Sequence, residues 1–151
     1  MKEINIKISR WDSGFDDVEL PKYETHGSSG LDLRAAISEM KIINAGKFAL
    51  IPTNLSVEIP EGYEIQIRPR SGLAAKHGIG VLNSPGTIDS DYRGEIKIIL
   101  FNFSDSDFVI NRGDRIAQMV VSEVIKASLI LSENLNESKR GVNGFGHTGK
   151  D

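Results

Sequence analysis

The stretch LSVEIPEGYEIQIR, residues 55–68, decides the fold class of this chain. Polar and apolar residues alternate with period two in residues 55–59 and again in residues 63–68. Strands that bury only one face have this pattern. A Pro-Glu-Gly triplet at residues 60–62 separates the two runs and predicts a turn. We therefore expect two half-buried strands with a short connection between them.

The same strand signal recurs on both sides of this stretch. Residues 4–8 alternate in the same way, and three later runs are rich in β-branched and aromatic side chains, as buried strands are. These three runs are residues 96–103, 108–110 and 116–121. Many short strands with turn-forming residues between them predict an all-β sandwich, jelly roll or barrel.

One short helix is expected at residues 71–77, with Ser71 as its N-cap and Gly78 as its end. The apolar pattern fades after about residue 132. We therefore divide the chain into an all-β domain of residues 1–132 and a flexible, glycine-rich tail of residues 133–151.

Composition narrows the possible functions. The 151 residues carry a net charge of −3, which argues against stable nucleic-acid binding through a general basic field. Cysteine is absent, so disulfides, thiol nucleophiles and cysteine-bound zinc are excluded. No segment approaches the roughly 20 apolar residues that span a bilayer, and the start lacks the apolar run of a signal peptide. We expect a cytoplasmic protein with no membrane contact.

The stretch NSPGTIDSDYRGE, residues 83–95, places the carboxylate of Asp89 three residues before the ring of Tyr92. Gly86 and Gly94 bracket this segment and relax its backbone, which predicts a turn at a hairpin end. A carboxylate held there can take a proton from water, and a tyrosine ring can lie against a sugar or a base. The same residue types also form turns for purely local reasons, so a structural role stays open.

Two further segments are candidates for holding an anion. Residues 68–72, RPRSG, lead into the expected helix, whose N-terminal amides favour anions. Residues 140–149, RGVNGFGHTG, combine Arg140, permissive glycine backbone and the hydroxyl of Thr148, a set that suits a phosphate chain. The ring of Phe145 can stack on a base. The alternative is a disordered tail with an incidental ring.

Several polar or aromatic residues have less specific contexts. Gln118 lies in an apolar run and needs a partner if it is buried. Asp32, between apolar neighbours, is either structural or an outer-shell group for a hydrated metal, and spacing alone favours a structural role for both residues. His26 and His77 have no second histidine at ligand spacing, so zinc is not expected. Trp11 is predicted to be a packing anchor.

Five segments, taken in order, resemble the motifs of the homotrimeric deoxyuridine triphosphatases, the dUTP diphosphatases. They are residues 30–35, 69–74, 86–94, 113–118 and 140–149. The resemblance implies a jelly-roll-like β-clip subunit and a homotrimer in which each active site draws on all three chains. It also implies Mg²⁺-dependent hydrolysis of dUTP to dUMP and pyrophosphate, which limits uracil incorporation into DNA and supplies dUMP for thymidylate synthesis.

The resemblance implies that the central motif carries the reaction and the nucleoside selectivity. Asp89 would deprotonate the water that attacks the α-phosphorus in line. Tyr92 would lie against the deoxyribose and leave no space for a ribose 2′-hydroxyl. Asn83 and the backbone near Gly86 would pair with the uracil edge.

The resemblance assigns the phosphates to other motifs. Arg70, Ser71 and Gly72 would bind them from a neighbouring subunit, with help from Gln118. Asp32 would contact the waters of a Mg²⁺ ion that binds mainly through the phosphates.

The last motif would close over the nucleotide. Phe145 would stack on uracil, while Arg140, Gly146, His147 and Thr148 would reach the terminal phosphates and exclude bulk water. His147 stands where the family most often has serine, which predicts a change in KM or pH dependence rather than in reaction type.

Two other functions compete with this interpretation. A dCTP deaminase, or a bifunctional deaminase-triphosphatase, resembles the family in fold and nucleotide site, but the Tyr92-Arg93-Gly94 segment favours the triphosphatase. A catalytically silent nucleotide-binding regulator is the second. The presence of Asp89 together with the complete last motif favours catalysis over this role.

Overall fold

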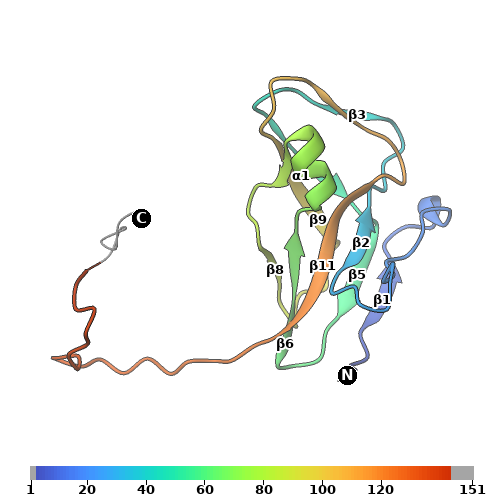
Figure 1. The fold of residues 1–151 in the computed structure, drawn as a ribbon. Coiled ribbons are helices and arrows are strands. Elements are labelled where there is room, and N and C mark those ends of the chain that lie inside the picture. The colour runs from blue at the N-terminus through green and yellow to red at the C-terminus, as the bar shows by residue number, and fades with distance from the viewer. Residues whose placement is uncertain (1–2, 144–151) are drawn as a thin grey trace.

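The computed structural model describes residues 3–143 and confirms an all-β chain with one short helix. Figure 1 shows the strands gathered in one body, which the chain leaves after its last strand. In chain order the elements are β1 (Lys7–Arg10), η1 (Ser13–Phe15), β2 (Leu31–Arg34), β3 (Lys41–Ile43), β4 (Phe48–Pro52), β5 (Leu55–Glu58), β6 (Tyr63–Arg68), α1 (Ser71–His77), β7 (Ile79–Val81), β8 (Gly86–Ile88), β9 (Lys97–Asn102), β10 (Phe108–Ile110) and β11 (Arg115–Glu123).

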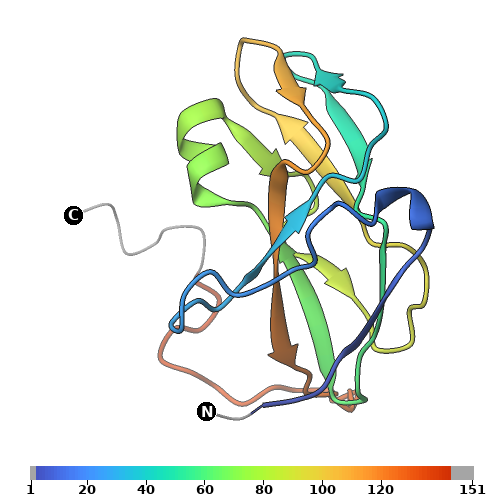
Figure 2. The ribbon, with the colours of Figure 1, turned by 90° about the vertical axis from the view of Figure 1, so that its right-hand side faces the viewer.

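The strands form two larger sheets and two strand pairs. One sheet has the order β2-β11-β6-β8 and the other the order β4-β9-β7, while β1 pairs with β5 and β10 with β3. Every pairing is antiparallel. The nine-residue strand β11, which runs through the middle of the view in Figure 2, pairs with β2 on one side and β6 on the other, and so joins three of the sequence segments with candidate site residues. This arrangement is the jelly-roll-like fold expected from the sequence.

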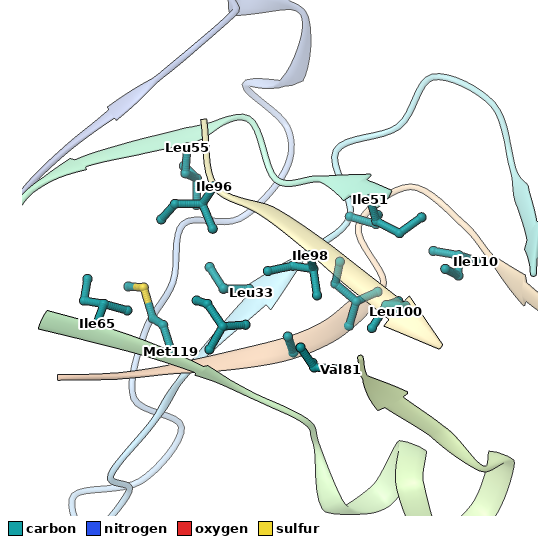
Figure 3. Close-up of a cluster of buried hydrophobic side chains, with 14 of the residues drawn as sticks. Leu33, Ile51, Leu55, Ile65, Val81, Ile96, Ile98, Leu100, Ile110 and Met119 are labelled. Atoms are coloured by element: carbon teal, nitrogen blue, oxygen red, sulfur yellow. The ribbon is translucent and has the colours of Figure 1, made fainter. Parts of the chain in front are cut away.

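The core lies between the sheets and is made of aliphatic side chains from many strands. Leu33, Ile65, Ile96, Leu100 and Ile110 are completely buried, and Figure 3 shows side chains from opposite sheets pointing toward one another. Burying one such side chain contributes about 1.5–3 kcal/mol. The packed core therefore gives the loops at the sheet ends a fixed foundation.

Residues 55–68 fold largely as their alternating pattern predicts. β5 and β6 contain the two alternating runs, and the backbone N–H of Tyr63 donates to Pro60 O at 3.2 Å in the turn between them. Ser56 is buried as well as its apolar neighbours, so β5 is not half-buried as expected. The strand expected at residues 4–8 begins later, at Lys7.

The helix is confirmed, but its predicted N-cap is wrong. Arg70, not Ser71, is the N-cap of α1, and its side chain makes no capping hydrogen bond. Gly78 ends the helix as predicted. Its φ of 64° lies in the left-handed region that glycine adopts without strain, and its N–H donates to Ala74 O at 3.1 Å.

The chain beyond β11 contains no helix or strand up to residue 143. Ile125 and Leu131, for example, are 95% and 101% exposed. The proposed domain boundary at residue 132 and the flexibility of the tail remain predictions. Within residues 3–143, no helix has the length and apolar character needed to cross a membrane.

Candidate active site

A cavity of about 600 Å³ opens beside the segment that joins β8 to β9. Its walls contain both Asp89 and Tyr92, together with Asn83. The remaining lining residues are Trp11, Leu50, Thr87, Ile88, Gly94, Glu95 and Lys97. The structure therefore brings together three residues to which the resemblance gave different roles: Asp89 for the attacking water, Tyr92 for the deoxyribose and Asn83 for the uracil edge.

Strand β8 determines where Asp89 lies. Ile88 pairs with Ile65 of β6, so Asp89 is the first residue beyond the sheet. Gly86 is the first residue of this strand. The prediction that it brackets a turn together with Gly94 is therefore wrong. The lack of a side chain at Gly86 allows close packing, because a Cβ there would lie 3.2 Å from Cβ of Ile67 and 3.3 Å from Nδ2 of Asn83.

A turn links the carboxylate to the tyrosine. The backbone N–H of Tyr92 donates to Asp89 O at 3.1 Å, and the Tyr92 hydroxyl donates to Glu95 O at 3.0 Å. Gly94 makes room for the ring, since a Cβ there would lie 2.5 Å from Tyr92 Cζ. The Asp89 side chain is exposed and makes no hydrogen bond or ion pair within the described part of the chain. Its carboxylate is therefore free to accept a proton from water.

A second polar group gathers where β2, β11 and the start of α1 meet. Asp32 accepts from Arg70 Nε at its Oδ1 and from an Arg115 guanidinium nitrogen at its Oδ2, each at 3.1 Å. Gln118 lies opposite Asp32 in the β11–β2 register and donates to Pro69 O at 3.0 Å. The hydrogen-bond partner that the sequence predicted for Gln118 is therefore the backbone carbonyl of Pro69.

This second group brings together predicted residues of three motifs. Ser71 and Gly72 are exposed in the first turn of α1, directly after Arg70. None of these residues, nor Asp32 or Gln118, lines the cavity that contains Asp89. Within residues 3–143, the candidate site residues therefore form two separate polar groups.

The last motif is described only at its beginning. Arg140 is exposed, and its Nε donates to Asn143 O at 2.8 Å within the tail itself. Phe145, Gly146, His147 and Thr148 lie outside the described residues. In Figure 1 the chain approaches this motif along a path that leads away from the body.

Sequence reasoning missed or misassigned several residues. Trp11 is not a packing anchor, because its side chain is 61% exposed and lines the cavity with Asp89. Arg115 was not singled out, yet it donates to Asp32 Oδ2 at 3.1 Å. The pairing of Arg115 with Asp32 joins residues 83 positions apart, so no local pattern indicates it.

Fold and site together define a class: an all-β protein that offers a free carboxylate and an aromatic ring in one cavity, and an arginine-rich group suited to anions on another surface. The dUTPase family model matches residues 16–149. The chain belongs to the dUTPase family.

Close relatives share this sequence over most of its length. The deoxyuridine 5′-triphosphate nucleotidohydrolase of Chlamydia pneumoniae is 61% identical over 132 residues, which cover 87% of this chain and 91% of that protein. The protein of the same name from Fusobacterium nucleatum is 51% identical over 150 residues, covering 99% and 100% of the two chains.

Solved dUTPase structures share the fold. A dUTPase of Staphylococcus bacteriophage 80alpha, described with dUPNHPP, superposes with a TM-score of 0.84 at 24% identity, covering 96% of this chain and 98% of that one. A mutant dUTPase from phage phi11 of S. aureus, described as revealing a structural Mg(II) ion, has a TM-score of 0.77 at 21% identity, covering 89% and 100%.

Proposed function

We propose a mechanism for the reaction of this chain, the hydrolysis of dUTP to dUMP and pyrophosphate, in which Asp89 is the general base. The supporting observation is the free, exposed carboxylate that lies in one cavity with Tyr92. Asp89 takes a proton from a water molecule whose oxygen attacks the α-phosphorus. The bond from that phosphorus to the bridging oxygen breaks, and pyrophosphate leaves with the bonding electron pair.

Tyr92 selects the sugar in this mechanism. Its hydroxyl is held by Glu95 O and its ring lies against the backbone at Gly94, so the ring has little freedom to move aside. A ribose 2′-hydroxyl would therefore clash with the ring of Tyr92. Asn83 and the backbone at Gly86 pair with uracil, and a base with a mismatched polar edge leaves buried groups unpaired.

The second polar group holds the phosphates. Arg70 supplies a guanidinium fork that Asp32 orients, and the amides of Ser71 and Gly72 at the start of α1 are open to an anion. Gln118 is fixed beside them by its bond to Pro69 O.

Mg²⁺ is the metal that these residues fit. Both oxygens of Asp32 already accept from arginines, so this carboxylate suits contact with a metal-bound water better than direct ligation. When bound, Mg²⁺ neutralises charge on the triphosphate oxygens.

The complete site is assembled in a homotrimer, which brings the cavity of one chain to the arginine group of another. One supporting observation is that the two polar groups do not meet within one chain. A second is the exposed face of β4 in the β4-β9-β7 sheet, which carries Phe48 and Leu50, while Phe103 is exposed directly after β9. Such an apolar face is typical of a protein–protein interface. A third is the segment after β11, whose apolar residues, Ile125 and Leu131 among them, are exposed to solvent in the single chain and would be covered by a neighbouring copy.

The mechanism and assembly are tested with purified protein, Mg²⁺ and each of dUTP, dCTP, dTTP and UTP. We expect conversion of dUTP alone to dUMP and pyrophosphate, and a molar mass in light scattering three times that of the chain. Ammonia release from dCTP would favour the deaminase instead. Full activity of a monomer would contradict the shared site.

A further inference from the structure

Trp11 lies outside all five motifs, yet its backbone is held firmly at the edge of the cavity. The backbone N–H of Trp11 donates to the backbone carbonyl of Asn54 at 2.9 Å. The Asn54 side chain then binds both backbone groups of the next residue, accepting from Asp12 N and donating to Asp12 O, each at 2.7 Å. Three hydrogen bonds to one residue therefore fix the chain at Trp11.

Asn54 also connects this anchor to the proposed active site. It is buried and adopts a φ of 59°, a left-handed conformation that asparagine tolerates better than most residues. Its backbone N–H donates to Glu95 Oε1 at 3.0 Å, and Glu95 O accepts from the Tyr92 hydroxyl at 3.0 Å. A continuous chain of hydrogen bonds thus runs from Trp11 to the ring proposed to contact the sugar.

The indole of Trp11 forms a wall shared by two cavities. One is the cavity of Asp89 and Tyr92, and the other, of about 530 Å³, is lined by residues that include Phe15 and Met40. A large aromatic side chain held in water on a rigid backbone loses the stabilisation that burial provides. A ligand covering the ring would recover that stabilisation.

We propose that Trp11 is a substrate-contacting residue. With Tyr92 it forms the aromatic lining at the nucleoside end of the cavity that contains Asp89. This inference rests on the proposed placement of the deoxyribose against Tyr92. Contact of an aromatic ring with a base or sugar face is tolerant of sequence context and weakens binding markedly when lost. Trp11 acts on affinity for dUTP and not on the proton transfer, which belongs to Asp89.

The kinetic test compares Trp11→Ala and Trp11→Phe with the unaltered protein. For Trp11→Ala we expect KM for dUTP to rise by on the order of tenfold with kcat within about twofold, and for Trp11→Phe a much smaller rise. Met40→Ala is the matched control, because Met40 is also exposed but lines only the second cavity. Its KM should be unchanged.

The spectroscopic test uses the fact that Trp11 is the only tryptophan in the chain. Emission is titrated with a non-hydrolysable imido analogue of dUTP in the presence of Mg²⁺, and separately with pyrophosphate. We expect a saturable change with the analogue, at a midpoint equal to its inhibition constant, and none with pyrophosphate, which lacks the nucleoside.

An unchanged KM in Trp11→Ala would overturn the inference, as would an equal effect of Met40→Ala. Loss of the trimer in Trp11→Ala, measured by light scattering, would do so too, because it would make the ring a subunit contact. Failure of the unaltered protein to hydrolyse dUTP would instead refute the function on which the inference rests.

Discussion

The absence of a side chain at Gly94 determines where the ring of Tyr92 lies in the cavity. A Cβ on residue 94 would lie 2.5 Å from Tyr92 Cζ and 2.9 Å from Cε2, well inside van der Waals contact. The ring can occupy its place only because residue 94 is glycine. Its hydroxyl then reaches Glu95 O.

Gly94→Ala should therefore displace the ring and impair sugar selection. We expect KM for dUTP to rise about tenfold and the preference for dUTP over UTP to fall, because misplacement by about 1 Å is enough to disturb a fixed site. Steady-state kinetics with both nucleotides measure this. Gly27→Ala is the control, since a Cβ there meets nothing within 4 Å. Unaltered selectivity in Gly94→Ala would contradict the assigned role of Tyr92.

Asp89→Asn should separate binding from catalysis. The amide keeps the size of the carboxylate but cannot accept the proton of the attacking water, so kcat should fall by about 10²–10⁴ or more. Affinity for the imido analogue, measured by calorimetry, should stay within a few-fold. A variant that retained normal turnover would exclude Asp89 as the base.

At the scale of elements, the N-terminal segment is fastened to the loop before β11 by one arginine. Arg112 donates to both carboxylate oxygens of Asp17 and to Gly14 O, and its guanidinium lies 4.4 Å from the centre of the Phe15 ring. The hydrogen bond from Arg112 lowers the pKa of Asp17 below 3.8. The η1 turn thus depends on a charge that acid removes.

This contact predicts a pH-dependent contribution to stability. Because the pKa of Asp17 is lowered in the folded protein, its stabilisation is present above pH 3.8 and is lost as pH falls through the lowered value. Asp17→Asn should lower Tm at pH 6 and lower it less at pH 3. Glu61→Gln, at an exposed position without an ion pair in residues 3–143, should show no such difference. Parallel Tm curves for Asp17→Asn and the unaltered protein would refute this.

Local patterns in the sequence predicted the elements better than they predicted the contacts between them. Period-two alternation is a property of one strand, so β6 could be predicted from its own residues. The bonds that Asn54 makes to Asp12 and Glu95 span 42 and 41 positions, and no local pattern indicates such pairs. Trp11 was misassigned for this reason. The exposure of its side chain depends on how distant segments of the chain pack around it.

At the scale of the whole molecule, the segment after β11 has the least support from its own chain. Its most exposed apolar side chains are 87–103% exposed and belong to Ile125, Leu129, Ile130, Leu131, Leu135 and Val142. Covering them on another copy would be favourable, and it would carry Arg140 to a neighbouring cavity. The tail would then act in a site whose Asp89 belongs to a different chain.

Two inactive variants should therefore restore activity to each other. Chains carrying Asp89→Asn and chains ending at Ser138 should each be nearly inactive, the latter also binding the imido analogue weakly. After the two are refolded together, mixed copies of the proposed trimer should contain sites with an intact Asp89 and an intact tail. We expect a substantial fraction of the activity to return. If native mass spectrometry shows mixed trimers and no dUMP forms, the tail must serve its own chain.

The division of the site between copies also has a genetic consequence. In the proposed trimer, a chain with both Asp89→Asn and the truncated tail spoils the site that needs its carboxylate and a different site that needs its tail. One defective chain in a trimer would therefore silence two of its three sites. Expressed beside the normal gene, such an allele would behave as a dominant inhibitor, and its severity would depend on the ratio of the two gene products rather than on the loss of one copy.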